Sequence, residues 1–254
     1  MKYCLGYSLI IIIAFVSGCK QNPSNPQSGG TVSGIVKLYS DTGLALPNSG
    51  VLVSMSGSTQ TAQTNDTGFW QMTGVPEGTY TFSFTKQGFG AMKVFGVQVK
   101  GRDTVAEVDM AEPATEEVNF ATLSIGLKTQ DSTAFYFIQG GLQPPFIRIR
   151  SLALCISPDS AALANDPSSA SLILPYTTDP AMTGYAGEFY WNSTNTVILH
   201  QVAFKHGTKV FAALCVFGEG PKGSNFSNYY DLDLGKQVYT SLGPHAQIMS
   251  GVIP

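Results

Sequence analysis

Short stretches of alternating polar and apolar residues, separated by turn residues, follow one another along residues 31–111. Tyr80, Phe82 and Phe84 fall on one face of an extended segment that begins directly after the turn residues Pro76-Glu77-Gly78. Similar turn signals recur about every 8–12 residues, a spacing that is typical of small β-sandwiches. Because successive side chains of a strand point to opposite faces, one face of each stretch is expected to be buried. The pattern therefore predicts a β-sandwich over residues 31–111.

A second series of apolar stretches follows the acidic, proline-bearing segment 111–117, with one turn of helix predicted at 160–164. Its strands are predicted near 118–127, 133–138, 146–156, 171–174, 187–191, 196–203, 208–217, 229–234 and 237–242. Within this series, residues 196–227 are similar to fibronectin type III modules, and this resemblance implies an immunoglobulin-like sandwich. The predicted fold class is all-β, with two immunoglobulin-like β-sandwich domains in tandem, the second over residues 118–254.

The N-terminal 18 residues have the pattern of a lipoprotein signal peptide. Lys2 precedes an unbroken apolar run from Leu9 to Val16. A membrane-spanning helix needs about 20 apolar residues, so this shorter run predicts a cleaved signal. The residues Val16-Ser17-Gly18-Cys19 resemble the bacterial lipobox, which implies cleavage after residue 18 and acylation of Cys19. Two or three acyl chains, at about 0.8 kcal/mol per buried methylene, would anchor the chain stably.

Residues 19–30 are rich in Pro, Asn, Ser and Gly without apolar periodicity, which predicts a flexible tether. The lipobox resemblance implies a membrane partner through the lipid anchor and a place in the bacterial cell envelope. Lys20 follows the cysteine where some bacteria use Asp to retain lipoproteins, so we expect outer-membrane anchoring. Both sides of that membrane, the periplasmic side and the cell surface, stay open as the place of the protein.

Four motifs in the first unit carry a resemblance to a known family. They are V-x-G-x-V at 32–36, a D-x-G turn leading to V-x-V across 41–53, T-x-D-x-G-x-W at 64–70, and V-P-x-G-x-Y at 75–80. Together they are similar to the carboxypeptidase regulatory-like domain. The resemblance implies a transthyretin-like (prealbumin-like) seven-stranded sandwich that acts as a folding or presentation module without catalytic residues.

Three residues of the motif at 64–70 receive structural interpretations. Asp66 is expected to accept hydrogen bonds from backbone N–H groups of its own turn, and Gly68 to supply a positive φ. Trp70, on the strand that follows, is expected to pack in the core. Peptidase activity is not expected, because a zinc carboxypeptidase needs a His-x-x-Glu pair and the sequence has none.

The amino-acid composition excludes several fold and function classes. Only 12% of residues are charged and the net charge is −3, which argues against helical bundles and against nucleic-acid binding. The chain has 3 histidines and no catalytic, Walker or dinucleotide motif, so we expect no enzyme activity, no cofactor and no metal site. Asp231 and Asp233 alternate along a predicted strand and are interpreted as a solvated face.

An aromatic cluster near residue 190 is the strongest candidate for ligand binding. Flat rings stack on sugar faces and amide groups bond sugar hydroxyls. By this reasoning a glycan site would use Tyr185, Tyr190, Trp191 and Asn192. Core packing of the same rings is the alternative.

Two cysteines remain once Cys4 leaves with the signal peptide and Cys19 is acylated. Cys155 and Cys215 both lie in apolar strands, and an exported compartment permits a disulfide. Such a bond would close a loop of about 60 residues and stabilise the fold by up to about 4 kcal/mol. Two inert buried thiols are the alternative.

The sequence thus predicts a lipid-anchored, non-catalytic cell-envelope protein that presents β-sandwich domains to a glycan or a protein partner. The alternative is an accessory or structural subunit of an outer-membrane receptor or secretion complex. An envelope hydrolase is the third hypothesis.

Overall fold

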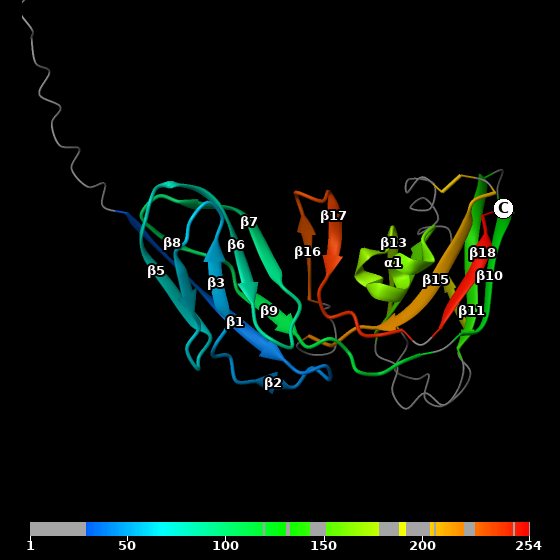
Figure 1. The fold of residues 1–254 in the computed structure, drawn as a ribbon, viewed down its shortest axis with the longest axis horizontal. Coiled ribbons are helices and arrows are strands. Elements are labelled where there is room, and N and C mark those ends of the chain that lie inside the picture. The colour runs from blue at the N-terminus through cyan, green and yellow to red at the C-terminus, as the bar shows by residue number, and fades with distance from the viewer. Residues whose placement is uncertain are drawn as a thin grey trace, which may run out of the picture.

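The structure is a computed structural model that describes residues 29–118, 120–130, 133–142, 151–177, 188–191, 204–205, 207–220, 227–245 and 247–253. Two β-sheet units follow one another, and the hairpin of β16 (Asn228–Asp231) and β17 (Lys236–Tyr239) stands between them (Figure 1). Within the described ranges the only helical segments are α1 (Ser160–Asn165) and a 3-10 turn at Pro167–Ser169. The all-β fold class is therefore confirmed.

The first unit is a sandwich of two sheets. One sheet is built around β1 (Gly30–Tyr39), with β2 (Ala45–Leu46), β5 (Phe69–Val75), β8 (Arg102–Thr104) and β9 (Val108–Ala111) as its neighbours. The other has the order β4 (Thr61–Gln63), β3 (Leu52–Met55), β6 (Gly78–Thr85) and β7 (Met92–Val99). The resemblance implied seven strands. The structure has nine segments because β2 is very short and because β8 and β9 lie end to end, both parallel to β1.

The core of this sandwich is aromatic. Trp70 is 1% exposed, and its ring centroid lies 5.5 Å from that of Phe82 and 5.8 Å from that of Phe84. Gly34 is paired with Trp70 across the ladder, and a side chain on Gly34 would collide with the indole. The expected core role of Trp70 and the shared buried face of Phe82 and Phe84 are confirmed.

The turn before β5 differs in one detail from the expectation. Gly68 has φ +84°, as expected. The backbone N–H groups of the turn are accepted by Asn65, whose Oδ1 lies 3.0 Å from the amide nitrogens of Thr67 and Phe69. Asp66 is exposed and does not take this role. The expectation for Asp66 was therefore wrong, because a side chain one residue earlier in the chain spans the turn.

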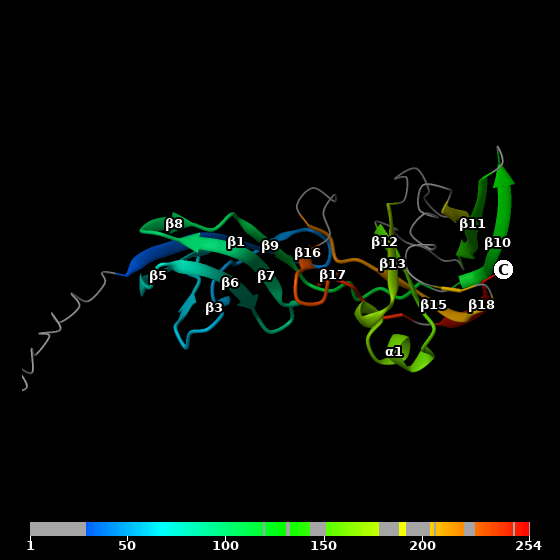
Figure 2. The same ribbon diagram turned by 90° about the horizontal axis from the view of Figure 1, so that it is seen from above.

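The second unit contains a sheet with the order β13 (Leu172–Thr177), β12 (Ser151–Ser157), β15 (Lys209–Val216) and β18 (Ile248–Val252). A further sheet has the order β10 (Phe120–Gln130), β11 (Thr133–Leu142) and β14 (Glu188–Trp191). The central strand β12 is buried along its whole length. One of its faces contributes Leu152, Leu154 and Ile156 to a core, and the opposite face lies under α1 (Figure 2).

Two predicted strands of this unit are revised. The strand expected over 229–234 ends at Asp231, because the Asp231 carboxylate accepts hydrogen bonds from the amides of Asp233 and Leu234 and closes a turn. The strand β18 was not predicted, since Ser250 and Gly251 interrupt its apolar pattern, and it forms by pairing with β15. The segment expected over 196–203 lies outside the described residues.

Candidate functional site

A groove of about 510 Å³ lies between the first unit and the β16–β17 hairpin, with walls from β7, β9 and β16. Its walls combine apolar side chains, aromatic rings and carboxylates. The residues that line the groove include Met92, Val94, Phe95, Glu107, Val108, Asp109, Tyr229, Tyr230 and Leu232. A concave site of this size with a few polar groups among apolar ones is typical of ligand sites.

The aromatic side chains of the groove come from β7 and from β16 of the hairpin. Tyr229 packs against the core of the first sandwich, and its ring centroid lies 6.3 Å from that of Phe95. The next residue, Tyr230, points the other way, as strand alternation requires, and 53% of its surface is exposed. Tyr229 is therefore an anchor between the units, whereas the ring of Tyr230 is open to a ligand.

The acidic wall comes from β9. Glu107 precedes the strand and pairs with Lys37 of β1, with Nζ 2.8 Å from Oε1. Two residues further on, Asp109 is half-buried, and its Oδ1 is buried without a hydrogen-bond partner among the described residues. Burial raises the pKa of Asp109, the Glu107 carboxylate raises it further, and Lys37 opposes both. Asp109 thus lines the groove, while its Oδ1 is buried behind the wall without a donor.

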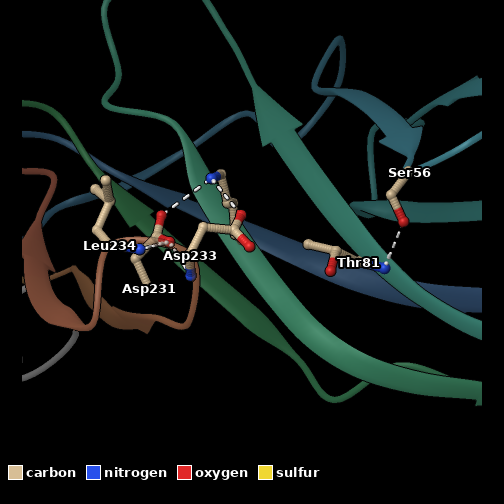
Figure 3. A network of polar contacts seen from close by, with 6 residues as sticks. Ser56, Thr81, Asp231, Asp233 and Leu234 are labelled. Carbon is tan, nitrogen blue, oxygen red and sulfur yellow. Dashed lines mark hydrogen bonds and ion pairs between the residues drawn. The ribbon is translucent and has the colours of Figure 1, made fainter.

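A half-buried ion pair joins the hairpin to β7. The Asp231 side chain is 1% exposed, and its Oδ2 lies 3.0 Å from Nζ of Lys93, while Asp233 is 3.9 Å from the same nitrogen. Figure 3 shows Asp231 also accepting from the amides of Asp233 and Leu234. The interpretation of Asp231 as part of a solvated strand face was therefore wrong, since the hairpin packs against the first unit.

These contacts shift both titrations. Desolvation raises the pKa of Asp231, but the hydrogen bond from Lys93 and those from the two amides outweigh it, so the pKa is lowered overall. The hydrogen bond to Asp231 raises the pKa of Lys93, against a smaller effect of desolvation. Both charges are therefore retained at neutral pH and hold the groove together.

Backbone contacts reinforce the junction of the units. The amide of Ala111 donates to Oγ of Ser227 over 2.8 Å, and the amide of Glu219 donates to the carbonyl of Asp41 over 3.1 Å. Gly218 lies so close to the carbonyl of Glu112 that a Cβ would overlap it, and Gly90 lies equally tightly against Thr240. The walls of the groove are thus held in place before any ligand arrives.

Comparison with protein families identifies the first unit. Residues 31–120 match the carboxypeptidase regulatory-like domain. The match confirms the resemblance carried by the motifs at 32–36, 64–70 and 75–80, and it runs to residue 120, where the sequence pattern placed the end at 111. Strands β7 and β9 of the groove therefore belong to the regulatory-like domain.

Several solved structures are similar in fold. A putative carbohydrate binding protein from Bacteroides uniformis is 12% identical, with 89% of this chain and 99% of that chain covered and a TM-score of 0.25. A DUF3823 family protein from Parabacteroides merdae is 10% identical, with 86% and 99% covered and a TM-score of 0.24. A type II cohesin-X-dockerin complex from Acetivibrio cellulolyticus is 23% identical, with a TM-score of 0.31.

The match to the cohesin-X-dockerin complex covers 34% of this chain and only 59% of that chain. The comparison with curated proteins gave no match. At these identities and TM-scores the likenesses carry no argument about what this chain binds.

The ion pair predicts a pH dependence of stability. We expect Asp231→Asn to lower the thermal midpoint at neutral pH, because Lys93 then loses a charged partner. The pKa of Asp231 is lowered from its ordinary 3.8, so its contribution is complete above that value and is lost as the pH falls through the lower folded value. Thermal midpoints followed by circular dichroism from neutral to strongly acidic pH should therefore converge for wild type and Asp231→Asn. The exposed Asp66→Asn is the control, and a wild-type advantage that persists at the most acidic pH would contradict this account.

The predicted glycan cluster is only partly described. Tyr190 and Trp191 lie in β14, opposite Gln139 and Ile138 of β11. Tyr185 and Asn192 lie outside the described residues, as does Cys19. The binding role of this cluster therefore stays a prediction, and the groove is a separate site that the sequence did not reveal.

The two remaining cysteines lie on neighbouring strands beneath α1. Cys155 is opposite Ala213, and Cys215 is opposite Ala153, which makes the cysteines diagonal neighbours. Both are buried free thiols in this structure. A hydrogen bond with Cys215, together with burial, raises the pKa of the Cys155 thiol well above its ordinary value. The structure thus shows the two buried thiols of the second alternative, and a disulfide between them stays a prediction.

Among the described residues, no three His, Cys, Asp or Glu side chains come together as metal ligands would. None of their helices is both long enough and apolar enough to cross a membrane.

Proposed function

We propose that the chain is a lipid-anchored, non-catalytic binding protein of the bacterial cell envelope, and that its ligand occupies the groove between the regulatory-like domain and the β16–β17 hairpin. The observation that carries the proposal is the groove of about 510 Å³ itself, in whose lining Tyr230 is 53% exposed and lies among apolar side chains and the carboxylates of Glu107 and Asp109. An exposed aromatic ring beside a few polar groups is the combination that ligand sites use.

The anchor part of the proposal rests on residues 1–19, whose signal-peptide pattern ends in Cys19. The described fold begins at residue 29, so about ten residues of tether would separate the lipid from β1. An extended tether of this length, at about 3.3 Å per residue, lets the groove face away from the membrane surface. Lys20 favours the outer membrane, as expected from the sequence.

A second candidate function is that of an accessory subunit in an envelope complex. The turn of the hairpin exposes Leu232 and Leu234, at 63% and 62%, beside the exposed Tyr230. Contiguous exposed apolar side chains of this kind are typical of protein contact sites. This candidate predicts that Leu234→Ala weakens complex formation, whereas the groove proposal predicts no effect of that substitution.

The experiment uses the full-length protein, purified in detergent, on a glycan array and against a random peptide library. We expect binding by one ligand class that falls about 10-fold in Tyr230→Ala, since ring contacts contribute about 0.5–1.5 kcal/mol. Leu44→Ala, an equally exposed apolar residue at 68%, is the matched control. A ligand that binds Tyr230→Ala as tightly as wild type would contradict the groove, and loss of binding in Tyr190→Ala or Trp191→Ala would transfer the site to the predicted cluster.

The lipid anchor is tested in bacterial cells that express the protein. Labelled palmitate should enter the wild-type protein and the Cys155→Ala control but not Cys19→Ala, which should leave the membrane fraction. Palmitate on Cys19→Ala would overturn the lipoprotein part of the proposal.

A further inference from the structure

The hairpin that forms one wall of the groove is held from both sides. Among the described residues, the groove is lined by residues 92–95 and 107–109 of the first unit and by residues 227–230 and 232 of the hairpin. Tyr229 and Asp231 of the hairpin contact β7 of the first unit. Tyr239 of β17 lies outside this lining and packs against the core under α1 in the second unit. The second unit therefore also supports the hairpin wall.

The support consists of a ring contact between Tyr239 and Phe217. Their ring centroids lie 5.3 Å apart with the planes tilted by 44°, and Phe217, which directly follows β15, is fully buried. Aromatic pairs prefer such inclined arrangements to a parallel sandwich. Phe217 belongs to the same core cluster as Leu163 of α1. One packed cluster thus joins α1, the end of β15 and β17.

Tyr239 and the open ring of Tyr230 lie on the same face of the hairpin. In the ladder of β16 and β17, Tyr239 is opposite Asn228 and Tyr230 is opposite Gln237, so the two tyrosines are diagonal neighbours. Diagonal side chains of an antiparallel pair are within reach of each other when they are as long as tyrosine. A shift of Tyr239 is therefore expected to shift Tyr230 as well.

Main-chain contacts fix the base of the hairpin. The amide of Gly218 donates to the carbonyl of Ser241 over 2.7 Å, and the amide of Gly243 donates to the carbonyl of Val216 over 2.8 Å. Beside β17, a hollow of about 360 Å³, lined in part by residues 166–168 and 238–240, separates the strand from the 3-10 turn. Because of this hollow, the orientation of β17 depends on the Tyr239 ring.

We propose that Tyr239 is a positioning residue of the groove. By packing on Phe217 it holds the hairpin wall, and with it the ring of Tyr230, at a fixed place relative to β7. The second unit thereby sets the shape of a site whose other walls belong to the regulatory-like domain. This inference rests on the proposed function, since it names what controls the same groove.

Amide hydrogen exchange of the full-length protein in detergent, read by mass spectrometry, tests the contact without a ligand. We expect Tyr239→Ala to speed exchange in β16 and β7 by about 10-fold, which corresponds to about 1.4 kcal/mol of lost protection. Exchange in β12 and β15 should stay within about 2-fold of wild type, because the hairpin loosens without unfolding of the second unit. Tyr239→Phe should exchange like wild type, because it keeps the ring.

Ile173→Ala is the matched control, because Ile173 of β13 packs against the same core cluster. It should speed exchange in β12 and β13 and leave β16 unchanged. Wild-type exchange of β16 in Tyr239→Ala would refute the inference. An equal rise in β16 and β15 would refute it too, because a general loss of stability has that effect.

The glycan array and the peptide library separate the inference from the proposed function. A glycan or peptide that binds in the groove should bind Tyr239→Ala about 10-fold more weakly than wild type and Tyr239→Phe equally well, since a displaced Tyr230 loses its ring contact. If binding is lost in Tyr230→Ala but unchanged in Tyr239→Ala, the groove functions and the inference is wrong. If exchange changes as expected and neither probe binds the wild type, the contact stands and the proposed function fails.

Discussion

We expect Trp70→Ala to lower the free energy of unfolding by about 3–5 kcal/mol, the usual cost of removing a large aromatic side chain from a core. The indole is 1% exposed and contacts Phe82 and Phe84, so its loss leaves a cavity at the centre of the regulatory-like domain. Urea unfolding monitored by circular dichroism measures the change. Phe69→Ala, at the adjacent and 40% exposed position, should cost clearly less, and equal losses would contradict this view of the core.

A conservative replacement sharpens this prediction. Nε1 of Trp70 is buried without a hydrogen-bond partner, so the indole N–H contributes nothing and costs desolvation. Trp70→Phe should therefore recover much of the stability lost in Trp70→Ala.

The second large effect is expected at the junction of the units. Gly218→Ala should destabilise the chain by about 1–3 kcal/mol, as overpacking of a tight contact does. Its Cβ would overlap the carbonyl of Glu112, so one of the two backbones must move. Scanning calorimetry should show a lower midpoint, with the two units unfolding more independently.

Gly101→Ala is the control for this substitution, because a Cβ on Gly101 meets nothing within 4 Å. The same scans would reject a tight junction if Gly101→Ala and Gly218→Ala lowered the midpoint equally.

The sequence predicted what depends on local pattern. Alternation and turn residues placed the strands of the regulatory-like domain, and the motif at 64–70 placed Gly68 and Trp70 correctly. It failed at Asp66, because Asn65 and Asp66 are both capable turn acceptors and only the backbone path decides between them. The cluster at Tyr185–Asn192 was singled out for the same local reason, and its role stays a prediction.

The groove could not have been predicted from local pattern. Tyr230 lies more than a hundred residues after Phe95 and Asp109, and it joins them only because the hairpin packs against the first unit. The alternation of Asp231 and Asp233 suggested a solvated strand. Asp231 instead ends the strand by capping a turn and pairs with Lys93, more than a hundred residues earlier.

The parallel pairing of β9 with β1 has a mechanical consequence for an anchored protein. The proposed tether would pull on the N-terminal end of β1, while a ligand in the groove would pull on the C-terminal end of β9 and on the hairpin. Because β1 and β9 run in the same direction, these opposed forces slide the two strands along each other. The hydrogen bonds of the ladder lie across the strands, so they are loaded in shear and must break together instead of opening one after another. The hydrogen bonds between β1 and β9, over the paired residues from Val36–Val108 to Tyr39–Ala111, would thus resist tension between the membrane and the ligand.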